Sequence, residues 1–152
     1  MVVPRQDQLA AAKMAETENI ILSARTGSGK TLVACLAIDH FLELDEEKHV
    51  LFVVPTRALV GQQARYIKEH CRVSVGTPAT LCGNEMESWK RANWDAALGR
   101  SRVLVGTPEV FRRAFVDCGF LAPTRFCLAV FDECHRATGN SPYAALLDAL
   151  LG

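Results

Sequence analysis

The segment that most constrains this chain is residues 24–31, with the sequence Ala-Arg-Thr-Gly-Ser-Gly-Lys-Thr. It follows a short apolar run, residues 20–22, and precedes an apolar-rich stretch, residues 32–44, so the expected order is strand, glycine turn, helix. Gly27 and Gly29 let successive backbone N–H groups face inward as a nest for an anion, and the positive end of the following helix adds to it. The segment therefore predicts a phosphate-binding loop and a nucleoside triphosphate site.

The end of this loop has the residue types that a bound triphosphate requires. Lys30 is expected to reach the β and γ phosphates, and the Thr31 hydroxyl to take one coordination position of Mg²⁺. Ala24 stands where the general Gly-x-x-x-x-Gly-Lys-Ser/Thr pattern has its first glycine. The alternative is a glycine turn that only joins a strand to a helix; Gly-Lys-Thr between a strand and a helix favours the nucleotide site. The expected nucleotide-binding residues of the loop are Thr26, Gly27, Ser28, Gly29, Lys30 and Thr31.

An acidic pair, Asp132 and Glu133, directly follows the last apolar run, residues 126–131. In a doubly wound sheet, ligands bind at the carboxyl ends of the strands, and both this pair and the glycine loop follow expected strands. We expect Asp132 to hold Mg²⁺ through water, and Glu133 to orient and deprotonate the attacking water. Taken alone, such a pair could simply begin a helix with favourable charge. Downstream of a phosphate loop it indicates catalysis, which makes Lys30, Asp132 and Glu133 the expected catalytic residues.

Strand and helix patterns alternate along the chain, which predicts an α/β fold with a doubly wound parallel sheet and helices on both faces. The buried side of the helix after the loop is expected to include Leu32, Cys35 and Leu36, and that of the next helix Val60, Ala64 and Ile67. The expected strands are residues 20–22, 49–54, 73–75, 79–82, 102–105 and 126–131, and the expected helices are 4–15, 31–44, 57–70, 88–98 (capped by Ser88), 109–116 and 141–150.

Composition limits the class of protein. The 152 residues suffice for one domain with a core, and 17 basic residues balance 17 acidic ones, so any nucleic-acid site must be local. The six cysteines have no zinc-like spacing, and we expect buried, reduced thiols. The chain lacks a signal-like start and an apolar run of about 18 residues, so we expect an intracellular protein, cytoplasmic or nuclear, without a membrane partner.

Four segments in order resemble the first RecA-like lobe of superfamily 2 helicases. Residues 24–31 match motif I, residues 55–59 (Pro-Thr-Arg-Ala-Leu) match motif Ia, residues 105–108 (Val-Gly-Thr-Pro) match motif Ic, and residues 132–135 (Asp-Glu-Cys-His) match the DExH form of motif II. The resemblance implies a P-loop NTPase of the RecA-like fold, with ATP and Mg²⁺ as cofactors and a helicase activity.

The subfamily can be narrowed. Phe131 before the acidic pair, Pro142 and Tyr143 after it, and the paired Trp89 and Trp94 look most like the N-terminal helicase of Dicer ribonucleases. The chain is also similar to the helicases of double-stranded-RNA sensors and, more distantly, to Hef and Fanconi-type DNA translocases. The expected nucleic-acid partner is double-stranded RNA.

The resemblance implies further roles for individual residues. An Arg-x-x-Gln pattern near the start serves the adenine in these relatives, so Gln8 is the expected adenine reader. His135 would couple nucleotide to nucleic acid. Loops at strand ends offer N–H groups, hydroxyls and a guanidinium to phosphates, although Pro and Gly also end strands as ordinary turn residues. The expected contacts to the nucleic-acid backbone are Pro55, Thr56, Arg57, Gly83, Thr107 and Pro108.

Other aromatic and basic residues give weaker signals. Trp89 and Trp94 could stack bases, but five positions on a helix do not give one shared face, which favours core packing for at least one of them. The basic pairs at residues 90–91 and 112–113 could contact phosphates, although most such pairs are solvated.

The chain ends soon after motif II, without the Ser-Ala-Thr motif of such a lobe. We therefore expect residues 1–152 to form a helicase ATP-binding (RecA-like 1) domain that is incomplete at its C-terminus and needs a second RecA-like lobe for efficient hydrolysis. A non-catalytic nucleic-acid or protein interaction module that retains the fold is the alternative.

Overall fold

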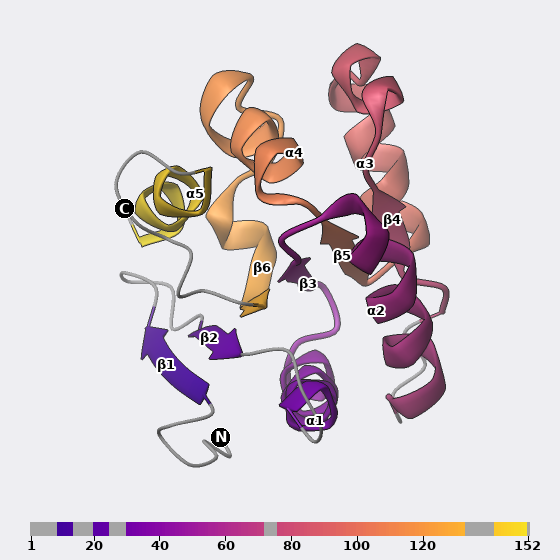
Figure 1. Ribbon diagram of the computed structural model, residues 1–152, viewed down its shortest axis with the longest axis vertical. Coiled ribbons are helices and arrows are strands. Elements are labelled where there is room, and N and C mark those ends of the chain that lie inside the picture. Colours follow the sequence, from indigo (N-terminus) through magenta and orange to yellow (C-terminus); the bar gives the residue numbers. More distant parts are fainter. Residues whose placement is uncertain (1–8, 14–19, 25–29, 72–75, 133–141, 152) are drawn as a thin grey trace.

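A sheet of six strands forms the centre of the computed structural model, which describes residues 9–13, 20–24, 30–71, 76–132 and 142–151 (Figure 1). The strand order is β1-β2-β6-β3-β5-β4. From β2 to β4 across the sheet every pair of neighbours is parallel, whereas β1 is antiparallel to β2. The strands are β1 (Leu9–Lys13), β2 (Ile20–Ala24), β3 (His49–Val53), β4 (Ala79–Leu81), β5 (Val103–Gly106) and β6 (Phe126–Asp132).

The central strands are apolar on both faces. Every residue of β3, β5 and β6 is buried. Continuous apolar runs of this kind are typical of parallel strands that helices cover on both sides. The strands predicted at 20–22, 49–54, 79–82, 102–105 and 126–131 are therefore confirmed, while the one predicted at 73–75 lies outside the described residues.

Helices cover both faces of the sheet (Figure 1). Side chains alternate along a strand, so Val50 and Phe52 of β3 pack in the core with the first two helices, and Leu51 and Val53 pack with the later ones. The first group is α1 (Lys30–Leu44) and α2 (Arg57–His70); the second is α3 (Arg91–Arg100), α4 (Pro108–Arg112), the π-helical turn η2 (Arg113–Asp117) and α5 (Pro142–Leu151); the 3₁₀ turns are η1 (Asn84–Ser88) and η3 (Pro123–Arg125).

The helix predicted at residues 4–15 is wrong for its described part, because residues 9–13 form strand β1. Five residues of β1 pair with β2, from Leu9 opposite Ala24 to Lys13 opposite Ile20. An isolated helix this short is marginal in water even when it is rich in alanine, so pairing along the edge of an existing strand overrides helix propensity. The parallel sheet therefore gains one antiparallel strand at its edge.

Two smaller predictions are also wrong. Ser88 does not cap a helix: it ends η1, and α3 begins at Arg91 after Lys90, whose backbone N–H donates to Asn93 Oδ1 at 2.9 Å. Leu36 is 47% exposed, because the buried stripe of α1 passes through Cys35, Ile38 and Leu42 at helical spacing. Cys35 was correctly placed in the core, and so were Val60, Ala64 and Ile67 of α2.

The end of α1 is tied to the sheet by one side chain. Arg102, just before β5, donates to the carbonyl oxygens of Leu42 at 3.3 Å, Asp45 at 2.6 Å and Lys48 at 2.9 Å. Orphan carbonyls at a helix C-terminus need such partners, and α1 has no basic residue in its own last turn. The guanidinium therefore fixes the orientation of the helix whose first residue is Lys30. Among the described helices, none combines the length and the apolarity needed to cross a bilayer.

Candidate nucleotide and nucleic-acid site

The strands that precede the predicted site segments end at one edge of the sheet. Because β2, β3, β5 and β6 are parallel, their carboxyl ends share this edge. The glycine loop follows β2, Pro55-Thr-Arg follows β3, Thr107 and Pro108 follow β5, and the acidic pair begins at the last residue of β6. Segments more than 100 positions apart in the sequence are thus brought to one side of the molecule.

The structure describes some of the residues that are predicted to bind nucleotide. Lys30 is the first residue of α1, which places it at the positive end of a 15-residue helix. Asp132 is 3% exposed and lies opposite Ala24, the last residue of β2, in the parallel ladder. The strand that leads into the glycine loop and the strand that carries Asp132 are therefore direct neighbours. Thr31 lies in the first turn of α1; outside the described residues are Gln8, Thr26, Gly27, Ser28, Gly29, Glu133 and His135.

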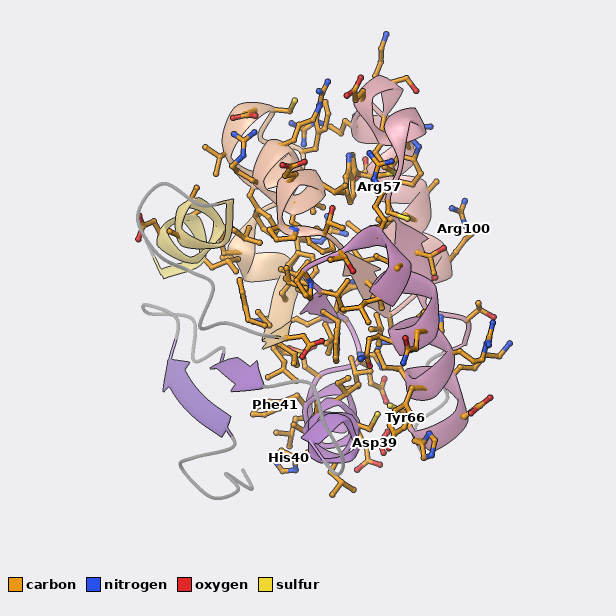
Figure 2. The ribbon with its side chains drawn as sticks, in the orientation of Figure 1. Asp39, His40, Phe41, Arg57, Tyr66 and Arg100 are labelled. Carbon is orange, nitrogen blue, oxygen red and sulfur yellow. The ribbon has the colours of Figure 1, made fainter. Side chains whose placement is uncertain are left out.

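The predicted nucleic-acid residues lie at helix starts and in one turn. Thr56 precedes α2 and Thr107 precedes α4, and neither hydroxyl caps its own helix. Arg57, the first residue of α2, is exposed; Figure 2 shows it in the upper half of the view, well away from His40 and Phe41 of α1 in the lower half. The remaining members are the half-buried Pro55, the buried Pro108, and Gly83, whose φ of +98° is one that only glycine adopts freely.

A cavity of about 310 Å³ joins three of these residues. Arg57 at the start of α2, Gly83 before η1 and Thr107 before α4 line it together. Its remaining wall is partly apolar and partly charged: Trp94, Val110 and Phe120 are among the apolar members, and the charged ones are Glu87, Glu109, Arg112, Arg113 and Asp117. Cavities of this size suit small ligands or one unit of a polymer.

Sequence analysis missed most of these charged residues. The pair Arg112 and Arg113 was noted as a weak candidate, and the cavity places both beside Arg57. Glu87, Glu109 and Asp117 gave no signal, because an isolated acid on a short helix cannot be told from a solvated one. The cavity therefore combines three arginines with three carboxylates.

The two tryptophans pack against each other. Their rings meet edge to face, with centroids 5.2 Å apart and planes at 77°. Trp94 is 3% exposed and also lies 6.4 Å from the ring of Phe111, whereas Trp89 is half-buried. The prediction that at least one of them serves the core is confirmed for Trp94.

Buried titratable groups with shifted pKa lie away from this edge. Burial lowers the pKa of His49, at the start of β3, and raises the pKa of the Cys127 thiol, near the start of β6, to about 11. The pKa of Cys71, after α2, is raised by a hydrogen bond with Cys35 and by burial. Cys35 and Cys127 are buried free thiols, as predicted, whereas the free thiols Cys71, Cys82 and Cys118 are only half-buried; Cys134 lies outside the described residues. Such thiols are poor nucleophiles, so they serve packing.

Comparison with known proteins agrees with the motifs. Residues 4–151 match the DEAD/DEAH box helicase family. The chain is 36% identical over 148 residues to "Endoribonuclease Dicer homolog 2b" of Oryza sativa subsp. japonica, which covers 91% of this chain and 10% of that protein. It is 36% identical over 144 residues to "Dicer-like protein 2" of Cryphonectria parasitica, covering 94% of this chain and 10% of that protein. The chain thus spans about a tenth of these relatives.

Solved structures give the same result for the fold. The helicase domain of Pyrococcus furiosus Hef superposes with a TM-score of 0.68 at 29% identity, covering 86% of this chain and 26% of that one. The UvsW helicase of bacteriophage T4, at 23% identity, shares the fold with a TM-score of 0.56, covering 87% of this chain and 42% of that one. The RecA-like fold and the resemblance to superfamily 2 helicases, Dicer homologues included, are therefore confirmed. This chain belongs to the DEAD/DEAH box helicase family.

Proposed function

We propose that this chain is the ATP-binding lobe of an ATP-dependent nucleic-acid helicase or translocase that acts on double-stranded RNA as part of a Dicer-like protein. The single observation that carries the proposal is the shared carboxyl edge of β2, β3, β5 and β6, since each of these strands leads into one of the four motifs. If a nucleotide and a polynucleotide bind at neighbouring loops of one edge, binding of one can change the binding of the other through the adjacent strands and loops. The similarity to Dicer homologues supports double-stranded RNA as the substrate.

The described backbone fits a nucleotide and its metal. Lys30 opens a long helix directly after the glycine loop, and helix N-termini favour phosphate. Asp132, buried at the end of the strand next to β2, would supply an oxygen ligand of the kind that Mg²⁺ prefers. Bound Mg²⁺ would neutralise charge on the phosphates. The proposed ligands of ATP are Gln8, Thr26, Gly27, Ser28, Gly29, Lys30 and Thr31, and those of Mg²⁺ are Thr31 and Asp132.

Catalysis would use residues from the end of the glycine loop and from the acidic pair at the end of β6. Lys30 would hold the β and γ phosphates, and Glu133 would orient the attacking water and take its proton. His135 would link this reaction to the bound polynucleotide. Residues 1–152 would act as the first of two RecA-like lobes, because helicases of this type bind nucleotide between two lobes and the second supplies an arginine to the transition state.

The proposed polynucleotide interface surrounds the cavity. The guanidinium of Arg57 and the hydroxyls of Thr56 and Thr107 would contact phosphates, with Pro55, Gly83 and Pro108 shaping the loops that present them. Contacts of this kind hold the backbone without reading base sequence. The chain as a whole has no net charge, so affinity would depend on these individual contacts to phosphates and not on a general basic field.

Steady-state ATP hydrolysis tests the proposal. The full-length product of this reading frame and its Glu133→Gln variant are assayed with no polymer, with double-stranded RNA and with double-stranded DNA. We expect double-stranded RNA to stimulate hydrolysis, and Glu133→Gln to abolish turnover while ATP still binds, because the amide cannot accept the proton of the attacking water. ATP binding without turnover under any of these conditions would contradict the proposal.

A lobe of a Hef-like DNA translocase is the second candidate. The superposition with the Hef helicase domain at a TM-score of 0.68 favours it. In the same assay, stimulation by double-stranded DNA and not by RNA would establish this candidate over the first.

A further inference from the structure

An ion pair forms part of the wall of the cavity described above. Arg112 Nη1 lies 3.1 Å from both carboxylate oxygens of Asp117. Both side chains are partly exposed, at 37% for Arg112 and 44% for Asp117. Solvent therefore reaches the pair, and so can a ligand that enters the cavity.

The pair exists because the backbone leaves α-helical geometry at this point. In a regular α-helix, residues three or four apart are neighbours on the surface, while residues five apart diverge. Here α4 passes into the π-helical turn η2, in which the N–H of Cys118 donates to the carbonyl oxygen of Arg113 at 2.9 Å, a bond between residues five apart. Short π-helical turns occur frequently at functional sites, and this one brings Asp117 back to Arg112.

The cavity places this pair next to the proposed polynucleotide contacts. Arg57, Gly83 and Thr107 line the same space as Arg112 and Asp117. The neighbouring Arg113 is held by the carbonyl oxygen of Glu87 at 2.8 Å, a neutral partner on η1. Arg112 differs from it in having a carboxylate partner, which occupies the guanidinium in the same manner as an anionic ligand.

We propose that Arg112 is a phosphate-binding residue whose guanidinium is held by Asp117 until a phosphodiester of a bound polynucleotide replaces that carboxylate. The inference rests on the proposed function, because a polynucleotide is the ligand that brings phosphates to this cavity. A guanidinium offers a planar fork of donors that fits two phosphate oxygens as well as two carboxylate oxygens. Partly exposed ion pairs contribute little to stability, so exchanging one anion for another costs little.

Equilibrium binding to nucleic acid tests the exchange. Fluorescence anisotropy of a fluorescein-labelled, blunt-ended double-stranded RNA, and of the matching DNA, is measured without nucleotide over a series of NaCl concentrations. Asp117→Asn releases Arg112 and should tighten binding about two- to fivefold. Arg112→Gln should weaken binding and reduce the slope of log K against log salt by about one. In the double variant, Asp117→Asn should have no further effect, because the competition needs Arg112.

Two matched variants control for net charge. Glu43→Gln removes an exposed carboxylate on α1, across the sheet from α4, and Arg100→Gln removes an exposed guanidinium at the outer end of α3, visible in Figure 2. Both should bind like the wild type. If Glu43→Gln tightens binding as much as Asp117→Asn, or if Asp117→Asn acts equally without Arg112, the exchange is refuted.

The same binding measurements distinguish a failure of this inference from a failure of the proposed function. Weaker binding by Arg57→Gln together with unchanged binding by Asp117→Asn and Arg112→Gln would overturn the role of Arg112 and leave the proposed interface standing. Absence of binding to either polymer by the wild-type protein would overturn both.

Discussion

Gly106 shows how a single residue positions a loop of the site. It ends β5 just before Thr107 and Pro108, and a Cβ there would lie 2.8 Å from the carbonyl oxygen of Leu81 and 3.0 Å from two ring atoms of Phe111. The backbone oxygen belongs to the neighbouring strand β4 and cannot rotate away. Only glycine allows β4, β5 and α4 to approach this closely, so its absent side chain sets the position of the loop.

We therefore predict that Gly106→Ala lowers the free energy of unfolding by about 1–3 kcal/mol, the range for overpacking a tight site. Gly61→Ala is the matched control: Gly61 lies inside α2, and a Cβ there would meet nothing within 4 Å. Because alanine costs less backbone entropy in a helix, this change should stabilise by about 0.5–1 kcal/mol. Urea denaturation followed by circular dichroism measures both. Equal effects of the two substitutions would show that β5 is not tightly packed at its end.

At the scale of elements, sequence predicted the buried strands and amphipathic helices, and missed features that depend on contacts with other segments of the chain. The helix Arg57–His70 was placed with both ends correct, because Pro55 stops the preceding strand and Val60, Ala64 and Ile67 mark a helical face. Strand β1 was missed because its pairing with β2 has no local signature. The pair of Arg112 with Asp117 was missed because a π-helical turn departs from the 3.6-residue period that sequence analysis assumes. The motif segments could be noted from sequence because their residue types are set by chemistry, and the roles assigned to them stay predictions.

The connection between α1 and β3 depends on Arg102, whose guanidinium donates to three backbone carbonyl oxygens. We predict that Arg102→Ala lowers the free energy of unfolding by about 2 kcal/mol, because charged hydrogen bonds to partly buried carbonyls are lost. Arg102→Lys should restore less than half of this loss, since an ammonium group cannot span carbonyls that a planar guanidinium reaches with two nitrogens. Denaturant titrations of both variants measure the effect. The exposed Arg100→Ala, whose expected change is within about 0.5 kcal/mol, is the control. Full recovery with lysine would mean that charge alone stabilises this turn.

At the scale of the whole molecule, the two edges of the parallel sheet differ. The carboxyl edge carries the loops of the candidate site. The amino edge is closed by packing: His49, the first residue of β3, is 8% exposed and its Nε2 donates to the carbonyl oxygen of Leu98 at 2.7 Å. Cys127 Sγ, from the adjacent strand, donates to the carbonyl oxygens of His49 and Phe41.

His49 makes the stability of this closed edge depend on pH. Burial lowers its pKa below the ordinary value of 6.5, the charges of Arg125 and Arg102 lower it further, and hydrogen bonding to the backbone of Leu98 partly opposes the shift. Below pH 6.5 the unfolded chain therefore binds a proton at His49, whereas the folded protein does not. The free energy of unfolding then falls as pH decreases, until pH passes the lowered pKa of the folded state. The slope from this one group is at most about 1.4 kcal/mol per pH unit.

Urea denaturation at a series of pH values from neutral downward should show this loss, and His49→Gln, which cannot titrate, should have a shallower pH dependence over the same range. Parallel curves for wild type and His49→Gln would mean that His49 takes up its proton equally in both states, and that burial at this edge does not govern the acid sensitivity of the fold.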